Sequence, residues 1–154
     1  MRRARRGGRP AAGGRGAGVR SGLAAATGDV VVIQDADLEY DPADWTPMFR
    51  LFQIGVADVV YGSRFYGRPH RALYLYHYLG NRTISALFNV LFDQTFTVLE
   101  TCYKMFRTDI LKSIPIRSNR FGFEPEIVMK CGKRNLRIYE VPISYHGRTY
   151  EEGK

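Results

Sequence analysis

Two aspartates separated by a single residue follow a run of aliphatic residues in the first third of the chain. Asp35 and Asp37 come directly after residues 29–34, DVVVIQ. In an extended backbone the side chains at i and i+2 point to the same side, so both carboxylates would face one site. Hard oxygen ligands of this kind hold Mg²⁺ or Mn²⁺, which can bridge a diphosphate and neutralise its charge as it leaves. The pair therefore predicts a catalytic metal site, although two acids at the surface end of a strand would show the same spacing.

Two arginines stand in short polar motifs further along the chain. Arg64 ends Gly62-Ser63-Arg64 after a second aliphatic run, and Arg82 ends Gly80-Asn81-Arg82 inside an aromatic segment, with Ser85 three residues later. A guanidinium group can form two parallel hydrogen bonds with phosphate oxygens. Each arginine alone is explained as well by a structural ion pair. Together with the aspartate pair, they predict two phosphate sites, one on a donor and one on an acceptor.

The hydrophobic pattern predicts strands that alternate with helices, which is typical of an α/β fold with a mostly parallel sheet. Residues 29–34 and 57–61 lack polar alternation, as expected of strands buried on both faces. Ligands of such sheets bind at the carboxyl ends of the strands, where the aspartate pair and Arg64 fall. Asp41 is expected to cap a helix that turns Trp45, Met48, Phe49 and Phe52 inward. The expected strands cover residues 29–34, 57–61, 103–107 and 136–144, and the expected helices cover 19–26, 41–55, 72–92 and 124–134.

The positive charge of the protein is concentrated at its N-terminus. The 154 residues carry a formal charge of +8, and residues 1–20 hold seven arginines and no acid. Without these arginines, 16 basic residues face 15 acidic ones, so the body is nearly neutral and nucleic acid is not an expected partner. Residues 1–18 are rich in Gly, Ala and Arg and are expected to form a disordered tail, followed by one domain over residues 19–154.

Neither a metal-binding cysteine motif nor a membrane-spanning segment is predicted. Cys102 and Cys131 lack metal-ligand spacing and are expected to be buried thiols. No run of 18 apolar residues occurs, so no helix is expected to cross a bilayer. Contact with a membrane would therefore be made from its surface.

Several separate strings of the sequence resemble family 2 glycosyltransferases, and specifically the dolichol-phosphate mannose synthase or polyprenyl-phosphate glycosyltransferase branch. The strongest is ATGDVVVIQDADLEYDP, residues 26–42. Residues 100–104, ETCYK, residues 119–126, NRFGFEPE, and residues 140–150, EVPISYHGRTY, match in the same order. The resemblance covers residues 14–154. It implies a GT-A-like (Rossmann-like) sheet flanked by helices, lacking the first strand–helix unit of the family.

The resemblance also implies a reaction and its partners. A sugar would pass from a nucleotide sugar of the GDP-mannose or UDP-glucose type to a polyprenyl or dolichyl phosphate by metal-assisted inverting transfer. The enzyme would work at the cytoplasmic face of a membrane, with the aromatic stretch 74–78 at the interface, although that stretch also suits a core helix. The implied donor-binding residues are Gln34, Asp35, Asp37 and Arg15, the implied acceptor-phosphate ligands are Arg64, Arg82, Ser85 and Arg148, and Glu100 and Glu124 are further candidates.

The sequence also departs from the pattern of this family. The P-x-Y-N-E-type motif is absent, N-x-G-K-G survives only as Gly14-Arg15-Gly16, and Val98 stands where an aspartate is expected. A truncated, non-catalytic remnant of the family is therefore one alternative. A Mg²⁺-dependent D-x-D phosphatase is another, although Glu39 stands where that fold requires a residue such as Thr or Val. Glu100 and Lys104 are also spaced as an ordinary i, i+4 surface pair.

Overall fold

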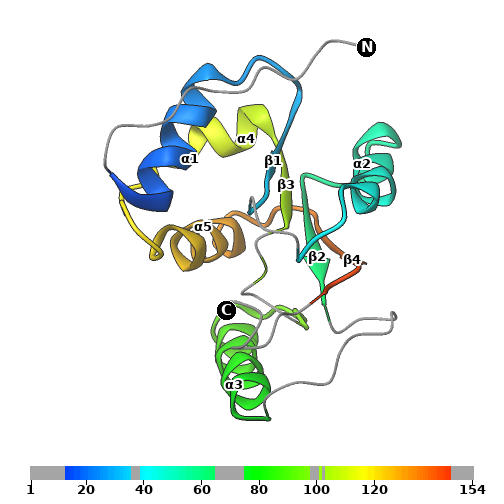
Figure 1. Cartoon of the computed structure of the whole chain (residues 1–154), viewed down its shortest axis with the longest axis vertical. Helices are drawn as coiled ribbons and strands as arrows, with labels where there is room; N and C mark the ends of the chain where they lie inside the picture. The colour runs from blue at the N-terminus through cyan, green and yellow to red at the C-terminus, as the bar shows by residue number, and fades with distance from the viewer. Residues whose placement is uncertain (1–12, 36–38, 65–74, 98–100, 102, 147–154) are drawn as a thin grey trace.

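A computed structural model of the chain describes residues 13–35, 39–64, 75–97, 101 and 103–146. In these residues four strands alternate with helices, and the helices lie on both sides of a single sheet (Figure 1). The α/β class expected from the sequence is confirmed. The elements are α1 (Gly14–Ala25), β1 (Val30–Ile33), the 3₁₀ helix η1 (Pro42–Asp44), α2 (Trp45–Gln53), β2 (Val59–Ser63), α3 (Leu75–Phe92), β3 (Lys104–Arg107), α4 (Thr108–Ser113), α5 (Phe123–Gly132) and β4 (Ile138–Pro142).

The sheet has the strand order β1-β3-β2-β4. Strands β2 and β4 pair in parallel, whereas β3 lies between β1 and β2 and is antiparallel to both. The expectation of a mostly parallel sheet therefore needs correction: three strands share one direction, but two of the three pairings are antiparallel. The cause is the insertion of β3, which separates strands that would otherwise be parallel neighbours. The carboxyl ends of β1, β2 and β4 still meet at one edge of the sheet.

The two faces of the sheet carry separate apolar cores. One core contains Tyr61, Phe106 and Ile127 and lies under α1, α4 and α5, and the other contains Met48, Val60 and Met105 and lies under α2. Strand β2 is buried at every position, as expected from the sequence. Strand β1 is only half-buried, because its only strand neighbour among the described residues is β3.

Helix α1 begins at Gly14, inside the segment 1–18 that was expected to be disordered, so that boundary was placed too late. Close packing explains the early start. A Cβ atom at Gly16 would lie 2.1 Å from the carbonyl oxygen of Ser118, and Ala17 N–H donates to the carbonyl of Asn119 at 3.2 Å. The small residues of this segment therefore allow the helix to contact the backbone directly. Residues 1–12 lie outside the described residues.

The helix after Asp41 is present, and its cap is confirmed: the Asp41 carboxylate accepts a hydrogen bond from Ala43 N–H at 2.8 Å. The inward face is rotated from the expected one. Met48 is buried, but Trp45 and Phe49 are exposed. The reason is Asp44, which is buried and accepts a hydrogen bond from Ser144 N–H at 2.6 Å, so it turns its own side of the helix toward the sheet.

One further element, α4, differs from the expectation. The short helix α4 follows β3 directly and gave no periodic signal over its six residues. Strand β4 ends at Pro142 on the outer edge of the sheet, as that proline predicts. Helix α3 lies at the end of the molecule farthest from α1 and α4 (Figure 1), and its Phe88 and Phe92 lie against Gly132 of α5.

Candidate active site at the carboxyl ends of the strands

Asp35 lies immediately beyond β1 and Gln34, and its carboxylate is bound by an arginine from another element. Arg15 of α1 places its Nη2 atom 3.0 Å from Asp35 Oδ2. The guanidinium also lies over the ring of Phe121, 5.0 Å from its centroid. This carboxylate therefore already faces a cation and an exposed aromatic ring at the edge of the sheet. Asp37, the second predicted metal ligand, lies outside the described residues.

The segment that carries Phe121 is fixed by Glu126. Its carboxylate accepts hydrogen bonds from the N–H groups of Arg117 and Ser118 and from the Lys130 ammonium. Burial alone would raise the pKa of Glu126, but these donors outweigh it and lower the pKa to about 2. Glu126 thus orders the loop that packs against Gly14 and Gly16 and so sets the position of Arg15.

Arg64 lies just beyond β2, at the same edge of the sheet as Asp35. Its guanidinium carbon is 4.8 Å from the ring centroid of Tyr145, which follows β4. The Tyr145 hydroxyl donates to Glu39 at 3.2 Å. Burial raises the pKa of Tyr145 although the positive charge of Arg64 opposes the shift, so the phenol stays protonated at neutral pH. The aromatic face thus fixes the position of this cation at the edge of the sheet.

Stacked tyrosines connect the loops that follow β1 and β4. Tyr40 stacks on Tyr103 with ring centroids 5.0 Å apart, and lies 5.4 Å from Tyr145. The Tyr103 hydroxyl donates to the carbonyl of Asp41 at 2.9 Å. Burial, followed by the negative charge of Asp44, raises the pKa of Tyr103 to about 12. These contacts fix the residues that follow the aspartate motif.

The two predicted phosphate ligands on α3 lie on different sides of the helix. Ser85 is buried with Phe88, whereas Arg82 is exposed to solvent. The role of Arg82 as a phosphate ligand, with Ser85, stays a prediction.

Lys104 was considered a partner of Glu100 on the surface, and this is wrong. It is 2% exposed in β3, because the strand places its side chain in the core. The ammonium donates to the carbonyl of Thr101 and lies 5.5 Å from the centroid of Tyr61. Glu100 itself lies outside the described residues.

Other predicted positions are described in part or not at all. Glu124 is half-buried in the first turn of α5. Cys131 is a buried thiol whose pKa burial raises to about 11, as expected of an inert cysteine. Cys102, Arg148 and the tyrosine at position 74 lie outside the described residues, as does Val98.

Of the two predicted metal ligands, Asp35 alone lies within the residues that the structure describes. Within the residues that the structure describes, no three His, Cys, Asp or Glu side chains gather as a metal site. However, the Asp35 carboxylate is 20% exposed and takes the positive guanidinium of Arg15 at 3.0 Å. A hard oxygen ligand in this position suits Mg²⁺ or Mn²⁺, with Asp37 as the second ligand predicted from the sequence.

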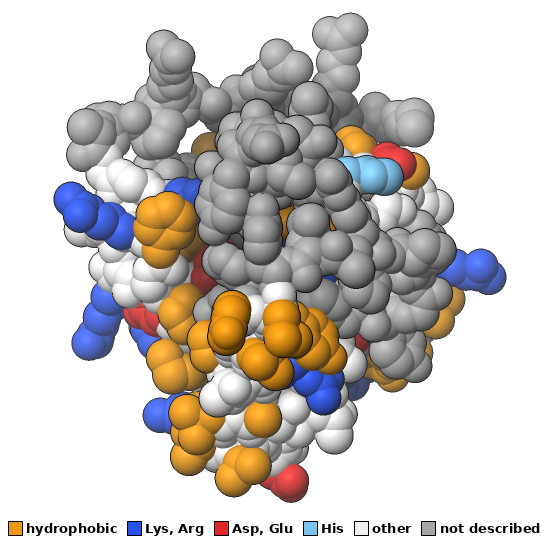
Figure 2. Space-filling view, turned by 60° about the horizontal axis from the view of Figure 1, so that its bottom comes forward, with side chains coloured by type: hydrophobic (Ala, Val, Ile, Leu, Met, Phe, Trp, Pro, Cys, Tyr) orange, Lys and Arg blue, Asp and Glu red, His pale blue; other side chains and the backbone are white. Residues whose placement is uncertain are grey.

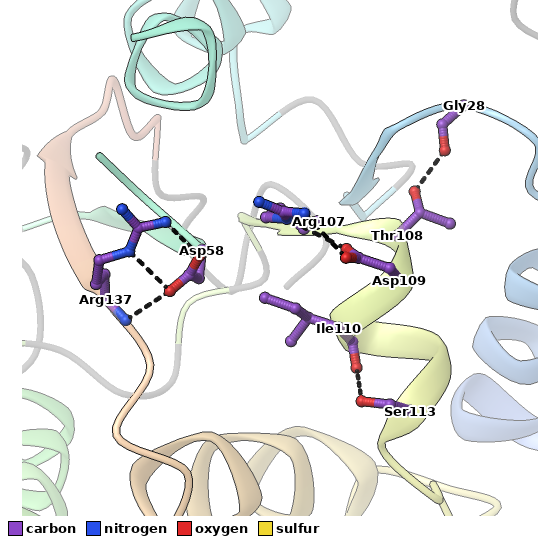
Figure 3. Close-up of polar contacts among 8 residues, drawn as sticks. All are labelled: Gly28, Asp58, Arg107, Thr108, Asp109, Ile110, Ser113 and Arg137. Atoms are coloured by element: carbon purple, nitrogen blue, oxygen red, sulfur yellow. Dashed lines mark hydrogen bonds and ion pairs between the residues drawn. The ribbon is translucent and has the colours of Figure 1, made fainter. Parts of the chain in front are cut away.

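The opposite end of the sheet carries a different polar cluster, shown in Figure 3. Arg137 donates to both carboxylate oxygens of Asp58, and Arg107 forms a two-pronged pair with Asp109. A hollow of about 490 Å³ lies beside them, with Gly28, Asp29, Arg107 and Asp109 among the lining residues. It adjoins the amino ends of β1 and β2, so it does not include any predicted site residue.

The structure thus brings Arg15, Gln34, Asp35 and Arg64 to one edge of the sheet. Sequence reasoning missed Glu39, Tyr145 and Glu126, and also Thr97, whose hydroxyl donates to Glu140 and lies 2.6 Å from the hydroxyl of Ser63 at the end of β2. A sequence signal existed for Tyr145, which stands in the string EVPISYH, and for Glu126 in NRFGFEPE. No local pattern marked Thr97, because its partners are distant in the sequence.

Comparison with known proteins gives a family match over most of the chain. Residues 9–114 match the model of glycosyl transferase family 2. Two Haloferax volcanii proteins are similar: the low-salt glycan biosynthesis hexosyltransferase Agl6, 29% identical over 126 residues, and the glycosyltransferase AglJ, 30% identical over 118 residues. The matches cover 80% and 77% of this chain but 30% and 39% of those proteins, so the chain spans well under half of their length.

Solved structures of glucosyl-3-phosphoglycerate synthase from Mycobacterium tuberculosis share the fold. The complex with Mn²⁺, UDP-glucose and phosphoglyceric acid gives a TM-score of 0.65 at 21% identity, covering 93% of this chain and 50% of that one. The complex with Mg²⁺ and UDP gives a TM-score of 0.62 at 19% identity, again covering 93% and 50%. At these identities the likeness establishes the GT-A-like fold.

Proposed function

The chain belongs to glycosyl transferase family 2, and we propose that it transfers a hexose from a nucleotide sugar to a polyprenyl phosphate at a membrane surface. The observation that carries the proposal is the common edge at which Asp35 and Arg64 follow strands of one direction. This reaction needs two charged groups in one place: a carboxylate that binds a metal–diphosphate and an arginine that binds a second phosphate.

The donor would bind at the Asp35 end of this edge. When bound, Mg²⁺ or Mn²⁺ held by Asp35 and Asp37 supplies the positive charge that makes a nucleoside diphosphate a good leaving group. Arg15 is bound to Asp35 without a donor, and its guanidinium is close enough to bind a diphosphate oxygen there. The similar M. tuberculosis enzyme was solved with UDP-glucose, and GDP-mannose and UDP-glucose are the donors we propose.

The acceptor would bind at the Arg64 end. A phosphate monoester has a second pKa near 6, so its oxygen is largely ionised at neutral pH and needs positioning more than deprotonation. Arg64 on the ring of Tyr145 supplies a fixed cation for that oxygen, with Arg82, Ser85 and Arg148 as further proposed ligands. The oxygen attacks the anomeric carbon as the nucleoside diphosphate leaves from the opposite side, which inverts the configuration.

The lipid part of the acceptor is supported by α3, which exposes more large apolar side chains than an ordinary surface helix. The buried side carries Ser85 and Phe88, together with half-buried Asn81 and Phe92, whereas Tyr76, Leu87 and Val90 are 86%, 61% and 82% exposed. Figure 2 shows hydrophobic side chains gathered on this face of the molecule. The described part of α3 contains no acidic residue.

An apolar helical face without acids suits the interface of a bilayer. No helix among the described residues is long and apolar enough to cross a membrane. We therefore propose peripheral binding of α3 at the cytoplasmic face, where a polyprenyl phosphate would present its headgroup to Arg64.

A transfer assay tests this function. The protein is incubated with Mn²⁺, with GDP-mannose or UDP-glucose, and with vesicles that contain a polyprenyl phosphate, and glycolipid is measured by mass spectrometry. We expect a hexosyl polyprenyl phosphate and no product from phosphoglyceric acid. Transfer to phosphoglyceric acid alone would refute the proposed acceptor, and release of inorganic phosphate without sugar transfer would favour a phosphatase.

Vesicle flotation tests the membrane part separately. Leu87→Asp and Val90→Asp should each weaken binding to vesicles at least several-fold, because a charge in the apolar face is costly at the interface. Ile54→Asp, at an apolar residue just after α2 that is 61% exposed, is the matched control and should leave binding unchanged. Equal binding by all three variants would contradict a role for α3.

A further inference from the structure

A chain of hydrogen bonds connects β4 to the carboxyl end of β2 through a loop residue. The Glu140 carboxylate of β4 accepts from Thr97 N–H at 2.9 Å and from the Thr97 hydroxyl at 3.1 Å. The same hydroxyl lies 2.6 Å from the hydroxyl of Ser63, the last residue of β2, which is fully buried. Three elements distant in sequence thus meet through one threonine.

The direction of these hydrogen bonds follows from their chemistry. A hydroxyl has one hydrogen, and Thr97 donates it to the carboxylate of Glu140, which can only accept. Ser63 must therefore donate to Thr97. The chain begins at Ser63 and ends on a negative charge, and a charged acceptor strengthens the bonds that lead to it. Each step has one arrangement, so the Ser63 side chain is held in a single orientation.

Ser63 is bonded directly to Arg64, whose guanidinium lies over Tyr145. The backbone at this point is also fixed to β4, because Ile143 N–H donates to the carbonyl of Ser63 at 3.1 Å. The side chain and the backbone of Ser63 are thus each tied to a different part of the molecule. These hydrogen bonds therefore fix Ser63, the residue that precedes Arg64.

We infer that Glu140 is a positioning residue for the transfer reaction: through Thr97 and Ser63 it fixes the start of the Arg64 side chain, and so the phosphate position of the acceptor. The expected change in the KM for the acceptor rests on the proposed function. The geometric part, that Glu140 and Thr97 order Arg64, does not depend on it. A purely structural tie would instead stabilise the loop at Thr97 without affecting the arginine.

Isosteric variants separate the two roles kinetically. Thr97→Val and Glu140→Gln should raise the KM for the polyprenyl phosphate about tenfold, because Arg64 would no longer be held in place for the acceptor phosphate. The KM for the nucleotide sugar should stay within about twofold. Thr97→Ser, which keeps the hydroxyl, should restore the acceptor KM. Thr108→Val removes a hydroxyl that donates to the carbonyl of Gly28 at 2.6 Å at the far end of the sheet and is the matched control.

A second measurement does not require catalysis. The Arg64 Nε atom is buried, so its N–H should give a distinct, slowly exchanging NMR signal, identified by its loss in Arg64→Lys. Thr97→Val should speed the exchange of this N–H at least severalfold, whereas Thr97→Ser and Thr108→Val should not. An unchanged Arg64 signal in Thr97→Val overturns the inference, as does an equal rise in both KM values. Absence of any sugar transfer by the unmodified protein, with the NMR result as expected, refutes the proposed function alone.

Discussion

The two ends of the sheet both carry acid–arginine pairs, but the pairs differ in what surrounds them. At the amino ends of β1 and β2, Arg137 and Asp58 bind each other through three hydrogen bonds, and Arg107 and Asp109 form a pair two residues apart on the surface. At the carboxyl ends, Asp35 and Arg64 contact residues from other elements. Arg15 comes from α1, and Tyr145 follows β4.

This difference shows that charge pairs alone do not mark a site. The Asp58 carboxylate has its pKa lowered mainly by hydrogen bonding to Arg137, which is the signature of a structural pair. The pair at Asp35 is instead joined to an aromatic ring and lies where ligands of α/β sheets bind. The location at the carboxyl ends of the strands, together with the aromatic rings that contact Arg15 and Arg64, distinguishes the candidate site from the opposite cluster.

The largest expected effect is a difference in sugar transfer between substitutions at the two ends of the sheet. Asp35→Asn should lower sugar transfer by about 100-fold or more, because it removes a charged ligand from the donor site. Asp109→Asn makes the same chemical change in an exposed acid at the opposite end and should leave transfer unchanged. Initial rates with saturating donor check this prediction. Similar losses in both variants would remove the functional distinction between the two ends.

A smaller effect tests whether Glu126 supports the donor side. Glu126→Gln should destabilise the fold by about 2 kcal/mol, since a half-buried acceptor of several charge-assisted hydrogen bonds is weakened. Because its pKa is lowered from 4.5 to about 2, its contribution is complete above pH 4.5 and is lost as the pH falls toward 2. Urea unfolding at pH 7 and at pH 3 measures this. The variant should lose less stability between the two pH values than the unmodified protein, and an equal loss would contradict this role.

The smallest effect concerns the pair at the opposite end. Asp58→Asn should cost about 1 kcal/mol of stability, because the Arg137 bonds lose their charged acceptor at a partly exposed site. The lowered pKa of Asp58 means that this stability is present above its ordinary pKa and declines as the pH falls below it. Thermal melting measures the loss. Sugar transfer at a temperature well below the melting point should not change, and a large loss of transfer would show that this end takes part in function.

Much of the fold could be predicted because its signals are local. The aliphatic run of β1, the Asp41 cap and the Pro142 end of β4 each depend on a few neighbouring residues. The direction of β3 could not be predicted, since four residues of strand pattern do not specify which neighbours they pair with. The inward face of α2 was missed because a buried acid, Asp44, outweighs the apolar pattern.

The candidate site was predictable in part for the same reason. Asp35 and Arg64 follow buried strands, so their location at one edge followed from the order of elements. The contacts that hold them were not predictable, because Thr97 and Glu140 are 43 residues apart and Tyr145 and Glu39 are 106 residues apart. Nor did the sequence indicate that α3 would expose its leucines and bury Ser85, which needs knowledge of what packs on the helix.

Paramagnetic NMR with Mn²⁺ and a nucleoside diphosphate tests the central claim most directly, because it locates the bound ion without requiring turnover. We predict selective broadening of the backbone signals of Gln34, Asp35 and Ser63, and loss of that broadening in Asp35→Asn. Signals of Gly28, Thr108 and Arg137 should stay sharp. Broadening centred on the Arg107–Asp109 end, or broadening that persists unchanged in Asp35→Asn, would contradict a donor site at the carboxyl ends of the strands.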